Sequence, residues 1–446
     1  MTAGCPLRDW LEERRAACRL SVQGITWREC TAWRFERGRL AHATGGFFSV
    51  AGIRADSSVV GLDGLAVPII DQPEVGILGF VVRARGTGHE WLIQAKAEPG
   101  NIGAVQLAPT VQATRSNFTR LHGGGATAYL DCFTAPDGGY DVVADSLQSE
   151  HGSRFLSKYN RNMTLLVAGQ SPDPCSAEWR WAAAPDLRAM LASDFAVNTD
   201  ARSVLFGSDW RLLADGAPFS RWRGTSGWGA CLLESFEVAP DQSDEDMLSW
   251  LAARRLGVRL NVRVVPLDSM PEWEVTADGI VHRQDGRPLL RAYQVRANTR
   301  EVETWDQPLV LSHREEAVTL ICQHRGGALR FLLRASAEAG FRERVQLGPT
   351  WQSDDVTAGN GAADQVLAAL QRGQERDSRL QSDEGGRFFH SVSRYRIVEL
   401  PATEAIDVEA RGYLWLDLGQ IHRLGGVQGM FTNEARSVLS MLLAWV

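Results

Sequence analysis

The sequence lacks the features that define several broad classes of protein. It has no apolar run approaching the roughly 18 residues that a membrane-spanning helix needs. With 47 basic against 54 acidic side chains, it also lacks the positive charge of a nucleic-acid-binding protein. Arginine, aspartate and glutamate interrupt its first twenty residues, unlike a signal peptide. We therefore expect neither a membrane nor a nucleic acid among its partners.

Cysteine is sparse and scattered. The seven cysteines are odd in number and form no C-x-x-C pair. Disulfide frameworks and structural zinc sites both use paired, closely spaced cysteines. We therefore expect reduced thiols, a cytoplasmic location and no metal site.

The signatures of common nucleotide and hydrolase sites are missing as well. There is no G-x-x-x-x-G-K-[ST] phosphate loop and no G-x-G-x-x-G opening a strand–helix unit. There is also no G-x-S-x-G turn and no H-E-x-x-H pair. These absences weigh against nicotinamide-dependent redox chemistry and zinc hydrolysis. They leave open a redox-neutral lyase, which needs only acid and base groups and no cofactor.

What the sequence does contain is an internal repeat, found by sliding the chain along itself by about 240 residues. Residues 105–110 (VQLAPT) then match 345–350 (VQLGPT), and 201–205 (ARSVL) match 435–439 (ARSVL). Further matches lie in the same order along the whole length of each half. The pattern predicts two homologous domains, 8–212 and 248–446, connected by 213–247.

Each half mixes strand and helix signals. Two β-prone runs, 77–83 and 90–97, flank a Gly-Thr-Gly turn and predict a hairpin, which 318–323 and 329–334 repeat. Each half ends in a predicted helix, with Asn433 as the expected N-cap in the second half and Thr199 at the corresponding start. A further helix is expected at 10–19. The predicted fold class is therefore α+β, as a tandem duplication of two mixed domains.

The two copies differ in their polar residues, and these differences indicate where chemistry resides. Lys96 and Asn101 of the first copy correspond to Ser336 and Phe341 of the second. The Thr-Arg-Ser-Asn run at 114–117 and the His-Gly-Gly-Gly run at 122–125 have no clear counterpart. Hydroxyl groups and a guanidinium suit a diphosphate, because both donate hydrogen bonds to phosphate oxygens. We therefore expect the chemistry in residues 8–212.

Other candidates have structural explanations of equal or greater weight. Arg154 and Arg202 occur in both copies, which favours structural ion pairs over a role in one site. Glu98 is retained as Glu338, so a structural turn carboxylate is as good an explanation as a catalytic one. Lys96 could be a solvated strand lysine and His122 an ordinary loop residue.

The segments QAKAEPGN (94–101), QLAPTVQATRSN (106–117) and HGG (122–124) give the chain a resemblance to the NDP-hexose 2,3-dehydratases. The runs GGFFSV (45–50) and YNRNM (159–163) and the duplication itself extend the resemblance over nearly the whole chain. The resemblance implies Nudix-like domains, each without the R-E-x-x-E-E-x-G run of Nudix hydrolases, and a dimer. The fifteen tryptophans, two of them in 213–247, also favour a homodimer.

The resemblance further implies a lyase that acts on dTDP-4-keto-6-deoxy-D-glucose in the biosynthesis of antibiotic sugars. It would remove water across C2 and C3 to give a dTDP-3,4-diketo-2,6-dideoxyhexose, which a 3-ketoreductase would then take over. By residue type, Glu98 is the candidate base, Lys96 the oxyanion stabiliser and His122 the proton donor. The predicted substrate-binding residues are Gln94, Asn101, Gln106, Thr110, Gln112, Thr114, Arg115, Ser116, Asn117, Tyr159, Asn160 and Arg161.

Several alternatives remain open at this point, including a Nudix-like diphosphatase with an unrecognised metal site and a purely structural duplicated module. The second half could be a relic that still binds a nucleotide through Gln346, Thr350 and Gln352. The whole chain could also be a non-catalytic nucleotide-sugar-binding protein, although the polar asymmetry between the halves favours an enzyme.

Overall fold

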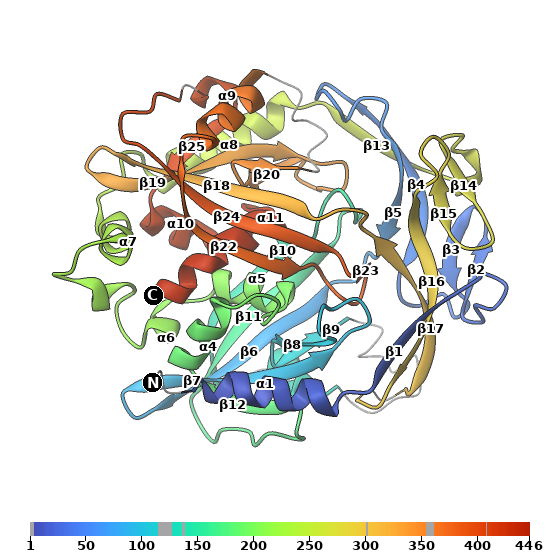
Figure 1. Cartoon of the computed structure of the whole chain (residues 1–446), viewed down its shortest axis with the longest axis horizontal. Helices are drawn as coiled ribbons and strands as arrows, with labels where there is room; N and C mark the ends of the chain where they lie inside the picture. The colour runs from blue at the N-terminus through green and yellow to red at the C-terminus, as the bar shows by residue number, and fades with distance from the viewer. Residues whose placement is uncertain (1–3, 115–126, 136–138, 300–301, 354–360, 407) are drawn as a thin grey trace.

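The computed structural model describes residues 4–114, 127–135, 139–299, 302–353, 361–406 and 408–446. Within these residues the fold is a mixed α+β arrangement of two large and two smaller sheets (Figure 1). The two large sheets lie one above the other in the view, and the smaller sheets stand together at their right-hand side. No helix of the described residues is long and apolar enough to cross a membrane.

The large sheet of the first half contains the predicted hairpin, β6 and β7, which confirms that expectation. Its order is β10-β11-β6-β7-β12, with β8 paired to β7 and β9 to β6, and the β11–β6 pair is parallel. The strands are β6 (Gly76–Arg85), β7 (Gly88–Ala97), β8 (Val105–Ala108), β9 (Val111–Ala113), β10 (Tyr140–Ser149), β11 (Tyr159–Val167) and β12 (Trp179–Ala183).

The second half repeats this sheet strand for strand. Its order is β20-β19-β18-β24-β22, with β21 paired to β18 and β25 to β19, and β18–β24 is the parallel pair. The strands are β18 (Glu316–Arg325), β19 (Ala328–Ala337), β20 (Val345–Gly348), β21 (Trp351–Gln352), β22 (Gln374–Ser382), β24 (Val392–Leu400) and β25 (Tyr413–Leu416). The equivalent pairings confirm the internal repeat at the level of structure.

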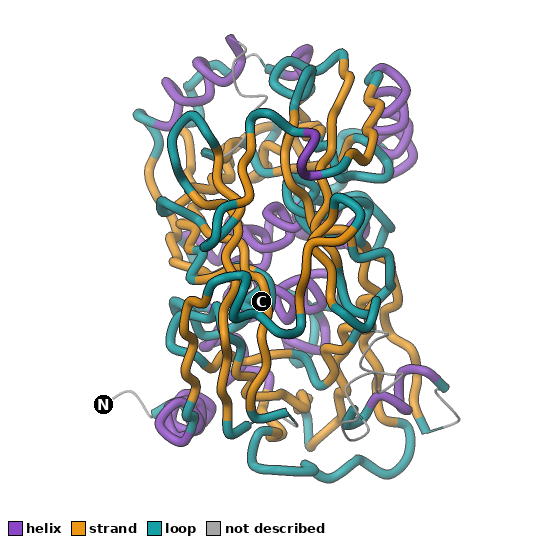
Figure 2. Tube along the Cα trace, turned by 90° about the vertical axis from the view of Figure 1, so that its right-hand side faces the viewer, coloured by secondary structure: helices purple, strands orange, loops and turns teal. Residues whose placement is uncertain are grey.

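The two smaller sheets, which face the viewer in Figure 2, exchange strands between the halves. Strand β1 (Leu20–Ile25) pairs with β16 (Pro288–Ala297) of the second half, and β13 (Leu260–Val265) pairs with β4 (Ser49–Ser57) of the first. The remaining strands are β2 (Trp33–Glu36), β3 (Arg39–His42), β5 (Ala66–Asp71), β14 (Trp273–Val275), β15 (Ile280–His282), β17 (Thr304–Leu311) and β23 (Phe388–Phe389). Neither half therefore completes its small sheet from its own residues.

Two equivalent helices, α5 (Thr199–Gly207) and α11 (Asn433–Ser440), pack against each other between the large sheets. The predicted terminal helices are thus present, but the N-cap is Thr432 and not Asn433. The hydroxyl of Thr432 accepts the Ala435 amide at 3.1 Å, as the side chain of Asn198 accepts the Ala201 amide in the first copy. Asn433 instead accepts a hydrogen bond from Thr199 across the interface.

The other helices pack around the two large sheets, with α10 in contact with α5. Helix α1 begins at Pro6 and ends at Ala17, four residues earlier than the predicted start. The segment 213–247 is packed structure as well: Trp222 donates to the backbone oxygen of Trp445 at 2.8 Å, and α7 contacts β19. The helices are α1 (Pro6–Ala17), α3 (Leu130–Thr134), α4 (Ala184–Leu191), α6 (Arg211–Ala214), α7 (Trp228–Glu237), α8 (Asp244–Gly257), α9 (Gly361–Leu370) and α10 (Leu418–Gly425).

Because the halves share a core, one buried ring should affect the whole chain. Phe206 is fully buried, and its ring centroid lies 5.4 Å from that of Phe431 of the other half. We expect Phe206→Ala to lower the free energy of unfolding by about 3–5 kcal/mol while unfolding remains a single transition, measured by urea titration. Phe35→Ala, at a ring that is 38% exposed, is the control and should cost about 1 kcal/mol or less. Two separate transitions would show that the halves unfold independently.

Candidate active site

A cleft of about 920 Å³ lies beside the large sheet of the first half. Its floor is formed by β7, β9 and the turn after β7, and aromatic side chains of the small sheets form part of its wall, among them Trp33, Phe48 and Trp305. Residues of the second half also line it, on β17 and in the loop from Glu384 to Arg387. The cleft is therefore built by both halves of the chain.

Lys96 and Glu98 lie side by side at the end of β7, where they reach the cleft. Lys96 Nζ lies 3.6 Å from Glu98 Oε1, and both side chains are almost fully buried. Gln112 on β9 donates to the same carboxylate oxygen at 3.0 Å, and Asn198 donates to Gln112 at 3.0 Å. Within the described residues Glu98 Oε2 makes no hydrogen bond. Oε2 of this positioned carboxylate is therefore available to accept a proton.

Two further carboxyl groups line the cleft near Glu98. Asp200 is at the start of α5, and burial together with the negative charge of Glu384 raises its pKa well above the usual range. Burial likewise raises the pKa of Glu384 to about 7, with further contributions from Glu150 and Glu98 against the opposing charge of Arg387. Groups with such values can carry a proton at neutral pH.

Cationic groups stand among these carboxyls. Lys158 precedes β11 and lines the cleft, and burial lowers the pKa of its ammonium. Arg387 lines the cleft with its guanidinium carbon 4.5 Å from the centre of the Phe48 ring, and one of its nitrogens donates to Gln72 at 3.2 Å. Fixed cations near a cleft are what a diphosphate needs.

The structure brings some of the predicted site residues to the cleft and places others elsewhere. Those that line it are Gln94, Lys96, Glu98, Thr110, Gln112, Thr114 and Asn160. Those that do not are Asn101, Gln106, Tyr159 and Arg161. Arg115, Ser116, Asn117 and His122 lie outside the described residues.

Two of the residues placed elsewhere, Gln106 and Tyr159, have partners in the other half of the chain. Gln106 donates to Ser382 Oγ at 2.7 Å, and its equivalent Gln346 accepts from Ser149 Oγ at 2.7 Å. The hydroxyl of Tyr159 accepts from Gln346, so this ring also belongs to the interface between the halves. Arg161 is instead paired at the surface with Asp145, at 2.7 Å.

Thr110 has a structural bond although it reaches the cleft. Its hydroxyl donates to the Leu92 oxygen and accepts the Val81 amide, and Thr350 makes the equivalent bonds to Leu332 and Ile321. This matched pair ties the hairpin strands together in both copies.

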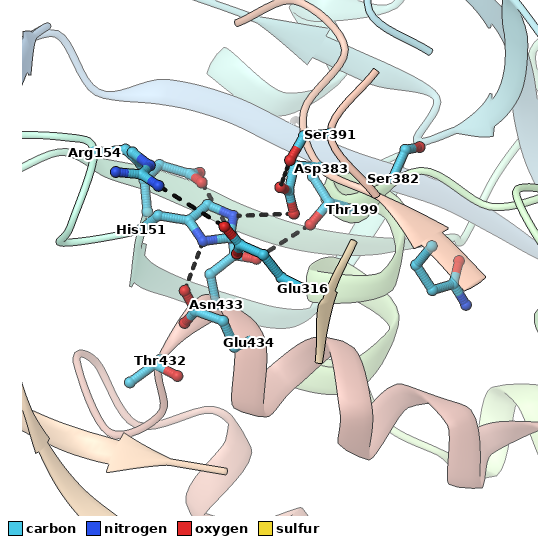
Figure 3. A network of polar contacts seen from close by, with 12 residues as sticks. His151, Arg154, Thr199, Glu316, Ser382, Asp383, Ser391, Thr432, Asn433 and Glu434 are labelled. Atoms are coloured by element: carbon cyan, nitrogen blue, oxygen red, sulfur yellow. Dashed lines mark hydrogen bonds and ion pairs between the residues drawn. The ribbon is translucent and has the colours of Figure 1, made fainter. Parts of the chain in front are cut away.

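At the equivalent place in the second half, a network of polar contacts surrounds a small cavity, and Figure 3 shows this network. The cavity there measures about 20 Å³, and its lining does not include Gln346, Thr350 or Gln352. His151, which comes from the first half, lies in it with Nδ1 2.7 Å from Glu434 Oε1 and Nε2 3.8 Å from Asp383 Oδ1.

Comparison with known proteins agrees with this doubled architecture. The sequence profile of the NDP-hexose 2,3-dehydratase family matches residues 5–207 and again residues 244–442. The chain belongs to this family. It is 33% identical to a dTDP-4-dehydro-6-deoxy-alpha-D-glucopyranose 2,3-dehydratase of Streptomyces violaceoruber, over 98% of this chain and 96% of the relative. It is 33% identical to one of Saccharopolyspora spinosa and 32% identical to one of Amycolatopsis orientalis, over 97% and 98% of this chain and 90% of each relative.

For this member of the 2,3-dehydratase family, the cleft residues that the sequence-based set did not include are numerous, and four charged ones among them are Asp200, Glu384, Lys158 and Arg387. A signal for two of them was present. In the aligned copies Glu384 stands opposite His151 and Lys158 opposite Ser391, which is the polar asymmetry that drew attention to Lys96. Asp200 and Arg387 match residues of like charge, Glu434 and Arg154, so comparison of the copies could not single them out.

The pair of His151 and Glu434 predicts how stability depends on pH. Burial opposes the charge of His151, but the carboxylate of Glu434 raises its pKa to about 10 from 6.5, and His151 lowers the pKa of Glu434 to about 2 from 4.5 against its own burial. The stability that charged His151 contributes is complete below pH 6.5 and is lost as the pH rises to 10. The stability that ionised Glu434 contributes is lost only as the pH falls from 4.5 to 2.

We therefore expect His151→Gln to destabilise the protein most near pH 6, on the order of 3–5 kcal/mol for a broken buried pair. The difference from the parent protein should shrink toward pH 10, as followed by urea titration across this range. His313→Gln, at an exposed histidine, is the control. A His151→Gln effect that is constant with pH would contradict the pairing.

Proposed function

We propose that this chain is a hydro-lyase that removes water across C2 and C3 of dTDP-4-keto-6-deoxy-D-glucose. The observation that carries the proposal is the buried pair of Lys96 and Glu98 at the floor of a large cleft, in a chain whose relatives bear the name of this activity. The product would be a dTDP-3,4-diketo-2,6-dideoxyhexose.

The chemistry follows from the ketone at C4. This ketone acidifies the hydrogen on C3, so that a base can remove it and leave an enolate. The C2 hydroxyl is then β to the carbonyl and leaves as water once an acid protonates it. The resulting 3-hydroxy-enone tautomerises to the diketone. The reaction requires a base, an acid and a donor to the developing oxyanion, and it consumes no nicotinamide.

In this proposal Glu98 is the base and Lys96 stabilises the oxyanion. Gln112 and Asn198 orient the carboxylate by their chain of hydrogen bonds, which keeps Glu98 Oε2 available to C3. Trp33, Phe48 and Trp305 offer flat apolar surfaces to the base of the nucleotide. His122 remains a predicted proton donor that lies outside the described residues.

We also retain several finer expectations as part of the proposal. The two large sheets would correspond to Nudix-like domains, and the unstable diketone would pass to a 3-ketoreductase in the biosynthesis of an antibiotic sugar. The seven cysteines form no disulfide, which supports a reducing compartment such as the cytoplasm.

The first test compares the same substitution in the two halves. Glu98→Gln should lower kcat by about 10²-fold or more, as expected on loss of a general base, and Lys96→Ala should do so through the oxyanion. Glu338→Gln, at the matched carboxylate of the second half, should stay within a few-fold. Turnover of dTDP-4-keto-6-deoxy-D-glucose is followed by chromatography, with circular dichroism as the check on folding. If Glu338→Gln is the more damaging change, the active half has been assigned the wrong way round.

A second test concerns assembly. We propose a homodimer, with a mass of about 98 kDa as twice the 49.1 kDa chain. Trp222 and Trp228, on which that expectation partly rested, are half-buried within the chain, so the resemblance to the family is what remains in support of the dimer. Light scattering at micromolar concentration should give the dimer mass, and a monomer alone would refute it.

A further inference from the structure

The two halves dock on each other through equivalent turns and loops. The turn after β7 donates from the Gly100 amide to the Gly385 oxygen at 2.8 Å, and the turn after β19 donates from the Gly340 amide to the Gly152 oxygen at 2.7 Å. One of these loops follows β22 and the equivalent loop follows β10, and each extends into the other half of the chain. The loop residues at equivalent positions are Glu384 in one crossing and His151 in the other.

The loop that carries Glu384 is tightly packed against the first half. A Cβ on Gly100 would lie 1.6 Å from the Phe388 oxygen, and one on Gly385 would lie 2.1 Å from Asn101 Oδ1. Backbone therefore packs directly on backbone at this crossing. Gln307 of β17 also donates to the Gly386 oxygen at 2.9 Å, which fixes the loop from its other side.

The fixed loop places two carboxyl groups from different halves at one point of the cleft. A Cβ built on Gly386 would lie 3.4 Å from Glu384 Oε1 and 3.5 Å from Glu98 Oε1. The two oxygens thus flank the same glycine, and Glu98, Glu384 and Gly386 all line the cleft. Glu98 belongs to the first half, which also carries Lys96, and Glu384 belongs to the second half.

We propose that Glu384, delivered by the second half, is the catalytic acid that protonates the departing C2 hydroxyl. This inference rests on the proposed dehydration. Glu98 takes the C3 proton, the electron pair of that bond forms the C2–C3 double bond, the C2–O bond breaks, and the oxygen leaves as water with the proton of Glu384. Glu98 is then protonated and Glu384 ionised, so one proton must return from Glu98 to Glu384. Both carboxyl groups lie near Gly386 in the cleft, and the proposal places the return of this proton there.

The surroundings of Glu384 suit a proton donor. Burial, with smaller contributions from the negative charges of Glu150 and Glu98, raises its pKa to about 7 against the opposing charges of Arg387 and Lys158. A carboxyl group with a pKa raised in this way can carry a proton at neutral pH. At the equivalent crossing His151 is held by Glu434 in a cavity of about 20 Å³, so the second copy has neither the acid nor the room.

The proposal separates two steps that one experiment can measure. In deuterium oxide, Glu384→Gln should still exchange the C3 hydrogen of dTDP-4-keto-6-deoxy-D-glucose, because Glu98 and Lys96 remain. It should lose elimination by about 10²-fold or more, as for a missing general acid. Proton NMR would then show the H3 signal disappearing from intact substrate. Glu98→Gln should lose both exchange and elimination.

Control variants keep the outcome decisive. Glu384→Asp, which keeps a carboxyl group, should recover part of the elimination and answers the case in which Glu384→Gln does not fold. His151→Gln changes the equivalent loop position and should leave the ratio of exchange to elimination unchanged. His122→Asn decides between the two proton donors, because only the true donor uncouples exchange from elimination.

Two results would overturn the assignment of Glu384. One is elimination by Glu384→Gln within a few-fold of the parent enzyme, and the other is a parallel loss of exchange and elimination, as for a structural residue. In either case dehydration by the parent enzyme would stand. If the parent enzyme neither exchanges nor eliminates, the proposed function itself fails.

Discussion

The direct contact of backbone on backbone where each turn crosses the loop of the other half is the constraint on which the rest of this structure depends. Gly100 and Gly340 lie so close to the opposing loops that a side chain at either position would overlap a carbonyl oxygen. Through one of these crossings, the second half completes the wall of the cleft in the first half. The exchanged strands β1 and β13 and the paired helices α5 and α11 then follow from the same approximate twofold relation.

Much of this fold was accessible from the sequence, because the repeat and the alternating apolar runs are local signals. The hairpins and terminal helices were predicted correctly, and the family emerged from the run around Lys96 and Glu98. The exchange of strands was not predicted, because the local sequence of β1 or β13 does not specify which strand, more than 200 residues away, it pairs with. The same limit hid Glu384, because its role depends on which half its loop enters.

Two of the predicted substrate-binding residues lie away from the cleft for the same physical reason. Gln106 and Tyr159 belong to motifs of the family, and a polar side chain in such a motif suggests a ligand. In the structure their polar atoms bond to residues of the other half, Ser382 and Gln346. A duplicated chain needs polar groups to set the register of its two copies, and a single sequence does not distinguish those groups from groups that bind substrate.

The two crossings also suggest why the second copy has been kept after losing Lys96. Its loop supplies Glu384 and Arg387 to the cleft, its strand β17 supplies part of the wall, and β16 accepts β1. The site of the first half would be open and short of a carboxyl without them. In the second copy the place of the acid is taken by His151, whose buried pair with Glu434 fills the space and binds the halves together. In this proposal the crossing with Glu384 contributes a catalytic acid, while the equivalent crossing with His151 contributes stability.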